Sequence, residues 1–91
     1  MRFEWDAKKR LINIKKHGID FIDVPAIFEL DTVTVLDERF DYGETRYQTL
    51  GLLRSRVILV VHTESETIIR IISARKATKY EEKNYFNQIA D

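Results

Sequence analysis

Arg56-Val57-Ile58-Leu59-Val60-Val61-His62 is the stretch of the chain that decides the fold. A nearly continuous apolar run of this length predicts a strand buried on both faces, and it is too short to cross a bilayer. Residues 45–53 before it and 67–74 after it also have strand patterns, and short loops join the three. Short connections favour antiparallel neighbours, so we expect a meander with residues 57–61 at its centre.

The rest of the chain supplies helices and two further strands. We expect strands at residues 3–5 and 32–36. Helices are expected between Asp6 and Gly18, over residues 20–30, and from Lys79 onward. Asp6, Asp20 and the Thr78/Glu81 capping box mark the helix starts, Gly18 marks a stop, and Pro25 delays the regular second helix to about residue 23. This order predicts a single α+β domain over residues 1–91, with two N-terminal helices packed on an antiparallel β-sheet and a C-terminal helix.

Composition excludes several classes of protein. The 91 residues contain no cysteine, so disulfides and thiolate metal sites are excluded and a reducing cytoplasm is expected. The opening residues lack the apolar core of a signal peptide, and we expect no membrane association. Glycine-rich phosphate loops and nucleotide-cofactor motifs are missing, so no cofactor is expected.

Charge is segregated along the chain although its net value is zero. Residues 1–17 carry six basic and two acidic side chains, whereas residues 18–44 carry one basic and eight acidic. Residues 45–80 carry seven basic and two acidic side chains. This pattern predicts a positive and a negative surface on one small body.

Arg70-Ile71-Ile72-Ser73-Ala74-Arg75-Lys76 is the main candidate for a binding site. Arginine beside a core needs an anion or a carboxylate, and guanidinium holds phosphate in a fork. Strand alternation predicts that Arg70 and Ser73 lie on opposite faces, and it leaves the direction of Arg75 open. Lys76 and Lys79 lie near the start of the last helix, where free N–H groups favour anions, so one phosphate can meet Arg70, Arg75, Lys76 and the helix N-terminus together. The alternative is that Arg70 pairs with a carboxylate such as Glu44.

Other polar side chains are weaker candidates. His62 ends the central strand and is either an acid or base near neutral pH or a strand-end hydrogen-bonding group. Glu44 and Arg46 are two residues apart on an expected strand, so they share a face, and Glu44 is either a general base held by arginines or a cross-strand ion-pair partner. Tyr80 lies next to the cationic cluster. Neither histidine has the spacing of a metal ligand, so no metal site is expected.

The chain resembles the BrnT toxins over nearly its whole length. The residues that carry the resemblance are Phe3-Glu4-Trp5-Asp6, Lys9, Asn13, Lys16-His17-Gly18, Phe21, Phe28, Gly43-Glu44-Thr45-Arg46-Tyr47, Thr49-Leu50-Gly51 and His62 to Lys76. The chain departs from the pattern at Ala7, Pro25 and Lys76. The resemblance implies a RelE-like fold and a metal-independent endoribonuclease that halts translation. It also implies a BrnA-like antitoxin with a ribbon-helix-helix part, through which alone the toxin would meet operator DNA.

These observations predict roles for the site residues. A ribonuclease without a metal uses the 2′-hydroxyl of RNA as its nucleophile and must move two protons and stabilise a phosphorane. We expect Arg70 and Arg75 to hold the phosphate with help from Lys76 and Lys79. Glu44 is the expected base, with Arg46 orienting it or touching RNA, and His62 or Tyr80 is the expected acid. The competing hypotheses are a non-catalytic nucleic-acid or protein-binding module and a structural partner subunit.

Overall fold

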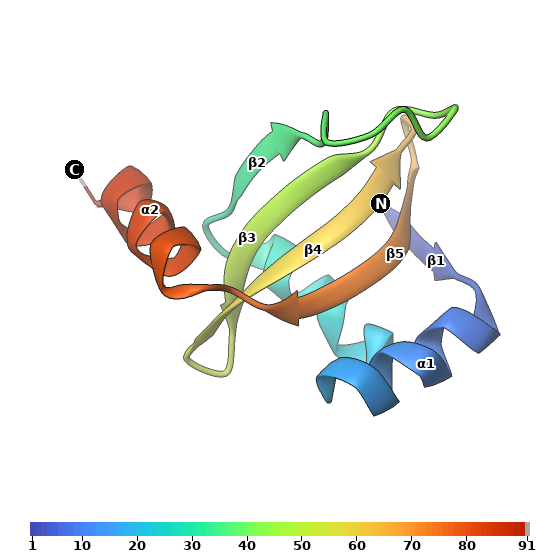
Figure 1. Ribbon diagram of the computed structural model, residues 1–91, viewed down its shortest axis with the longest axis horizontal. Coiled ribbons are helices and arrows are strands. Elements are labelled where there is room, and N and C mark those ends of the chain that lie inside the picture. Colours follow the sequence, from blue (N-terminus) through green and yellow to red (C-terminus); the bar gives the residue numbers. More distant parts are fainter. Residues whose placement is uncertain (91) are drawn as a thin grey trace.

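A five-stranded mixed sheet organises the computed structural model, which describes residues 1–90 (Figure 1). Its strands are β1 (Arg2–Trp5), β2 (Val33–Leu36), β3 (Tyr47–Leu53), β4 (Arg56–Glu64) and β5 (Ile68–Lys76), in the spatial order β1-β5-β4-β3-β2. β3, β4 and β5 form the expected antiparallel meander, and β2 pairs antiparallel to β3, but β1 pairs parallel to β5. The expectation of an antiparallel sheet is therefore wrong. Two helical segments separate β1 from the meander, so no short turn fixes its direction.

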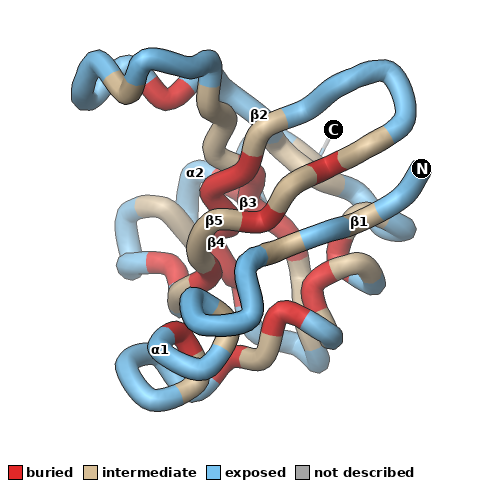
Figure 2. The backbone as a smooth tube through the Cα atoms, turned by 90° about the vertical axis from the view of Figure 1, so that its right-hand side faces the viewer, coloured by how far each residue is buried: buried red, intermediate tan, exposed pale blue. Residues whose placement is uncertain are grey.

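The central position of β4 is confirmed. β4 lies between β3 and β5, and every residue from Val57 to His62 is buried. Figure 2 shows this buried band in the middle of the sheet, with exposed backbone around it. A strand covered on both faces has no polar side to alternate with, which is why its sequence is a continuous apolar run.

The helical segments lie on both faces of the sheet, not on one. They are α1 (Ala7–His17), the 3-10 helix η1 (Phe21–Glu29) and α2 (Lys79–Ile89). η1 packs Phe21, Val24 and Ile27 against one face of the sheet, whereas α2 packs the buried Tyr85 against the other face, beside Leu59. Figure 1 shows α2 at the opposite end of the sheet from α1.

The second expected helix is not α-helical. Pro25 lies inside η1, and its nitrogen has no hydrogen to donate to a helical ladder. The flanking bonds are of the tighter i to i+3 kind, such as Asp23 N to Asp20 O at 3.0 Å and Leu30 N to Ile27 O at 3.3 Å. The capping role expected of Asp20 is confirmed, because its side chain accepts from Ile22 N.

α1 contacts the sheet through a polar side chain instead of an apolar stripe. Leu11 is 63% exposed, and Asn13 is the residue of α1 that is buried. Asn13 Nδ2 donates to the carbonyl oxygens of Ile19 and Ala74, each at 2.9 Å, and its Oδ1 accepts from Ala74 N at 3.1 Å. β1 pairs with β5 only as far as Ile71, so Asn13 satisfies backbone groups of β5 beyond the end of β1.

A β-bulge in β5 changes which residues share a face. Ile71 pairs with His62 and Ser73 pairs with Val61, so Ile72 is an extra residue in the ladder. Arg75 pairs with Leu59, and Arg70 pairs with Thr63. Leu59 and Thr63 are an even number of residues apart on β4, so they and their two partners lie on the same face of the sheet. The prediction that Arg70 and Ser73 lie on opposite faces is therefore wrong. The bulge brings Arg70 and Arg75 to one face, the face on which α2 packs.

Candidate active site

A carboxylate held between two arginines lies on this face of the sheet. Glu44 Oε1 accepts from Arg70 Nη2 at 2.7 Å, and Glu44 Oε2 accepts from Arg46 Nε at 2.9 Å. All three side chains are partly open to solvent, with exposures of 34% for Glu44, 37% for Arg70 and 21% for Arg46. We call these three residues the Glu44 cluster. It joins a strand residue, Arg70, to the loop that precedes β3.

A buried acidic residue braces this loop. The side chain of Asp37 is fully buried, its carboxylate accepts from Arg39 Nε and Nη2 at 2.8 Å each, and it accepts from Tyr42 Oη at 3.1 Å. The bonds from Arg39 lower the pKa of Asp37 to about 2. The guanidinium carbon of Arg46 lies 4.1 Å from the centre of the Tyr42 ring, a cation–π contact. Sequence patterns gave no sign of this brace, because an acidic residue in a polar loop is usually solvated.

The charge state of Glu44 follows from its two partners. The hydrogen bond from Arg46 and the charge of Arg70 hold the pKa of Glu44 below its ordinary value, so the carboxylate is ionised at neutral pH. Arg70 bonds Glu44 through one nitrogen, and so does Arg46. The remaining N–H groups of both arginines make no hydrogen bond to another residue of the described chain. The cluster therefore has a proton acceptor together with cationic donors that are still available to an anion.

A second ion pair lies at the other end of the same strand. Arg75 Nη1 and Nη2 donate to the two carboxylate oxygens of Glu81 at 2.8 and 3.0 Å. Glu81 also accepts from Thr78 N at 2.8 Å, and its own N–H donates to the Thr78 hydroxyl, which confirms the predicted capping box. The bond from Arg75 is the main cause that lowers the pKa of Glu81 to about 2. We call Arg75 and Glu81 the Arg75 cluster.

The two clusters do not meet at one phosphate. Arg70 and Arg75 pair with Thr63 and Leu59, four positions apart on β4, which corresponds to about 13 Å at roughly 3.3 Å per residue. Each arginine is bonded to its own carboxylate. The structure therefore does not bring Arg70 and Arg75 together at the single phosphate that we expected them to share with Lys76 and the N-terminus of the last helix.

Three of the predicted site residues lie at the Arg75 end. Lys76 is the last residue of β5, and Lys79 and Tyr80 begin α2. Tyr80 is 80% exposed and, with Glu81, borders a groove between α2 and the sheet that has a volume of about 250 Å³. The lining of this groove also includes Gln48, two residues after Arg46 of the Glu44 cluster. Sequence reasoning treated Glu81 only as a cap, and the structure adds its ion pair with Arg75.

His62 lies on the opposite face of the sheet from Arg70 and is fully buried. Its Nε2 is 2.7 Å from Thr49 Oγ1, which is in turn 2.7 Å from Thr34 Oγ1. The ring stacks on Tyr47, and burial lowers the pKa of His62. Sequence reasoning offered His62 as the acid for the phosphate held by Arg70. The structure separates the two by the thickness of the sheet, because His62 alternates with Thr63 on β4.

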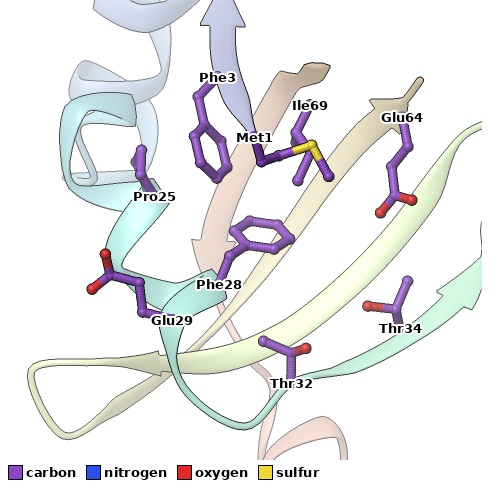
Figure 3. A pocket seen from close by; sticks show the side chains of 9 residues that line it. All are labelled: Met1, Phe3, Pro25, Phe28, Glu29, Thr32, Thr34, Glu64 and Ile69. Atoms are coloured by element: carbon purple, nitrogen blue, oxygen red, sulfur yellow. The ribbon is translucent and has the colours of Figure 1, made fainter. Parts of the chain in front are cut away.

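A cavity of about 460 Å³ lies on the His62 side of the sheet, between β1, η1 and β2 (Figure 3). Met1, Phe3, Phe28 and Ile69 give it an apolar lining, and the carboxylate of Glu64 lies at its rim. Its lining includes no lysine or arginine. A polyanion has no counter-charge there, so this cavity is not the candidate site for RNA.

Two searches of residues 1–90 are negative. No group of three or more histidine, aspartate or glutamate side chains is arranged to hold a metal ion in this part of the chain. None of the helices described here has the length and apolar character needed to cross a membrane.

Comparison with known families identifies the class of protein. The family described as "ribonuclease toxin, BrnT, of type II toxin-antitoxin system" matches residues 5–81. The match spans β1 to the first turn of α2 and includes both clusters. The chain belongs to the BrnT family of ribonuclease toxins, as its sequence led us to expect, and membership of a type II system implies a cognate antitoxin. A search of curated proteins found no match.

Proposed function

We propose that this toxin is a metal-independent endoribonuclease and that the Glu44 cluster is its catalytic centre. Family membership supports ribonuclease activity in general. The assignment of the centre is supported by one observation: Glu44 is an ionised carboxylate between two arginines that keep free N–H donors. The Arg75 cluster is the weaker candidate, because both terminal nitrogens of Arg75 are already bonded to Glu81.

In the proposed reaction the 2′-hydroxyl of RNA attacks the adjacent phosphorus. Glu44 accepts the proton of the 2′-hydroxyl, the new O–P bond forms, and the bond from phosphorus to the 5′ oxygen breaks. Arg70 and Arg46 donate hydrogen bonds to the phosphorane oxygens, where negative charge accumulates. The departing 5′ oxygen takes a proton from water. The products are a 2′,3′-cyclic phosphate and a 5′-hydroxyl.

The proposed centre gives the other predicted residues different tasks. Arg75, Lys76 and Lys79 bind RNA phosphates away from the scissile one, because they lie at the end of β5 opposite Arg70 or at the start of α2. Tyr80, with its exposed ring, is suited to stack on a base. His62 has no catalytic part in this proposal, since it is buried on the opposite face.

Cleavage of RNA on ribosomes or in free messages would inhibit translation, and we propose this as the toxic effect. We also propose a BrnA-like antitoxin with a ribbon-helix-helix part as the partner that neutralises it, and operator DNA is met only through that antitoxin. A cell-free translation reaction tests the first proposal. Added toxin should lower the protein yield, and an undiminished yield at a toxin concentration that cuts RNA would contradict it.

Digestion of RNA in EDTA tests the reaction class. The purified toxin should cut RNA with EDTA present and leave 2′,3′-cyclic phosphate and 5′-hydroxyl ends. Glu44→Gln, which keeps the size and removes the charge, should cut at least about 100-fold more slowly. RNA binding without any product would favour a non-catalytic module, and loss of cleavage in EDTA would exclude the metal-independent reaction.

A further inference from the structure

A cationic groove runs between α1 and β5, outside the Glu44 cluster. Its volume is about 220 Å³, and its α1 wall is built from Lys9, Ile12, Asn13 and Lys16. Ile12 and Asn13 each lie three or four residues from Lys9 and from Lys16, so the four residues form one face of the helix. His17 completes this wall, and Ile72 and Ser73 of the bulge form the other.

The lysines of this groove are not neutralised within the protein. Six arginines of the chain lie within 4.0 Å of a carboxylate, at positions 10, 39, 46, 54, 70 and 75. By the same criterion, no lysine pairs with a carboxylate of residues 1–90. The α1 lysines therefore keep their full charge for an external partner, as the excess of basic residues over 1–17 suggested.

The groove opens toward Arg75. Partial burial and the positive charges of Lys16 and Arg75 lower the pKa of His17. Ser73, at the groove, precedes Arg75 by two residues on β5. Positive charge thus continues from α1 onto the sheet end that carries Lys76 and Lys79. Ile12 is 61% exposed and gives the groove an apolar surface on which a ribose or base can lie.

We propose that this groove binds the RNA backbone and guides the strand onto the sheet face, with Lys9 and Lys16 as its phosphate contacts. The inference rests on the proposed ribonuclease function and adds a substrate-binding surface remote from the Glu44 cluster. RNA fits the groove better than an acidic protein segment does, because compact ammonium groups beside an apolar surface suit alternating phosphates and sugars. The cognate antitoxin is the competing occupant, and the test includes it.

The test compares two double variants of equal charge. Lys9→Gln/Lys16→Gln removes the groove contacts, and Lys8→Gln/Lys15→Gln is the matched control, since it removes two charges from the same helix outside the groove lining. All four lysines are exposed, so both variants should fold. The probe is a fluorescent 2′-O-methyl RNA, which binds but cannot be cut, and its affinity is measured by anisotropy over a range of salt concentrations.

The groove variant should bind the probe about tenfold more weakly. The slope of log affinity against log salt should become shallower by about 1.4, because each of the two lost phosphate contacts contributes roughly 0.7 to it. The control should change affinity less than about threefold. Equal losses in both variants would overturn the proposal, as would unchanged RNA affinity with weakened antitoxin binding. Cleavage of ordinary RNA by the wild type is measured alongside. If the wild type does not cut, the ribonuclease proposal fails; if it cuts while the groove variant binds normally, only the groove proposal fails.

Discussion

The Glu44 cluster and the Arg75 cluster place the same chemical groups at two ends of one strand. Both pair an arginine of β5 with a glutamate from another segment. At Glu81 the pair is bidentate, and Arg75 also donates to the carbonyl oxygen of Lys76, so three of the five N–H groups of Arg75 are bonded inside the fold. At Glu44 each arginine contributes a single bond, and other donors remain. The residue types of an arginine–carboxylate pair therefore do not reveal its role. What matters is how many N–H groups of the arginine remain free to bind a ligand.

Arginine substitutions should separate the clusters most strongly. Arg70→Ala removes a donor to the phosphorane and should lower the cleavage rate constant about 10²–10³-fold. Arg75→Ala should lower it less than about tenfold, since Arg75 is expected to bind a neighbouring phosphate. Single-turnover cleavage at saturating enzyme measures both. A larger loss in Arg75→Ala would move the catalytic centre to the other end of the sheet.

Stability should respond in the opposite order. Glu81→Ala removes half of the capping box and the partner of Arg75, and it should cost about 1–2 kcal/mol of unfolding free energy. Glu44→Ala should cost less than about 0.5 kcal/mol, because its pairs are partly solvated. Urea unfolding followed by circular dichroism gives both values. Equal losses would show that the Glu44 cluster is as structural as the Arg75 cluster.

Acid should weaken the Arg75 cluster over a defined pH range. The pKa of Glu81 falls from an ordinary value of 4.5 to about 2 in the folded protein, so the pair stabilises the fold above pH 4.5. That contribution is lost as pH falls from 4.5 toward 2. Unfolding free energies at pH 7, 4 and 3 should therefore converge for the wild type and Glu81→Gln. A difference that stays constant down to pH 3 would argue against the pair as its source.

The hydroxyl of Tyr80 should matter least. Tyr80→Phe keeps the ring and should leave the cleavage rate within about threefold of the wild type, because the proposed reaction takes its acid proton from water and uses the ring of Tyr80 only for stacking. A general acid contributes about 10²–10⁴-fold, so a loss of that size would make Tyr80 the acid and place the scissile phosphate beside Arg75. The pH profile of the wild-type rate would then show a descending alkaline limb.

Local sequence signals predicted local structure well. The apolar run at residues 57–61, the cap at Asp6 and the left-handed Gly18 all appear as expected, because each depends on neighbours within a few residues. The capping box of Thr78 and Glu81 was also predicted correctly from the sequence.

The features that local sequence patterns did not predict depend on contacts between distant parts of the chain. β1 pairs with β5, which is distant in the sequence, so no short turn between the two strands sets their relative direction. The extra residue at Ile72 moves Ser73 and Arg75 to the face of Arg70, and no composition rule marks a bulge there. The sequence marked Asn13 only as a residue shared with the BrnT toxins, and it did not reveal that the Asn13 amide joins α1 to Ala74 of β5. The sequence also left the partner of Arg70 open, since it allowed either a phosphate or a carboxylate such as Glu44, and the structure shows the bond to Glu44.

The central claim is that Glu44, and not Glu81, takes the proton from the attacking 2′-hydroxyl. The most direct test is the single-turnover cleavage rate constant of Glu44→Gln and Glu81→Gln, measured in EDTA at pH 7 with both proteins shown to be folded. The account predicts a loss of at least about 100-fold for Glu44→Gln and less than about tenfold for Glu81→Gln. Near wild-type cleavage by Glu44→Gln, with the large loss in Glu81→Gln, would contradict it.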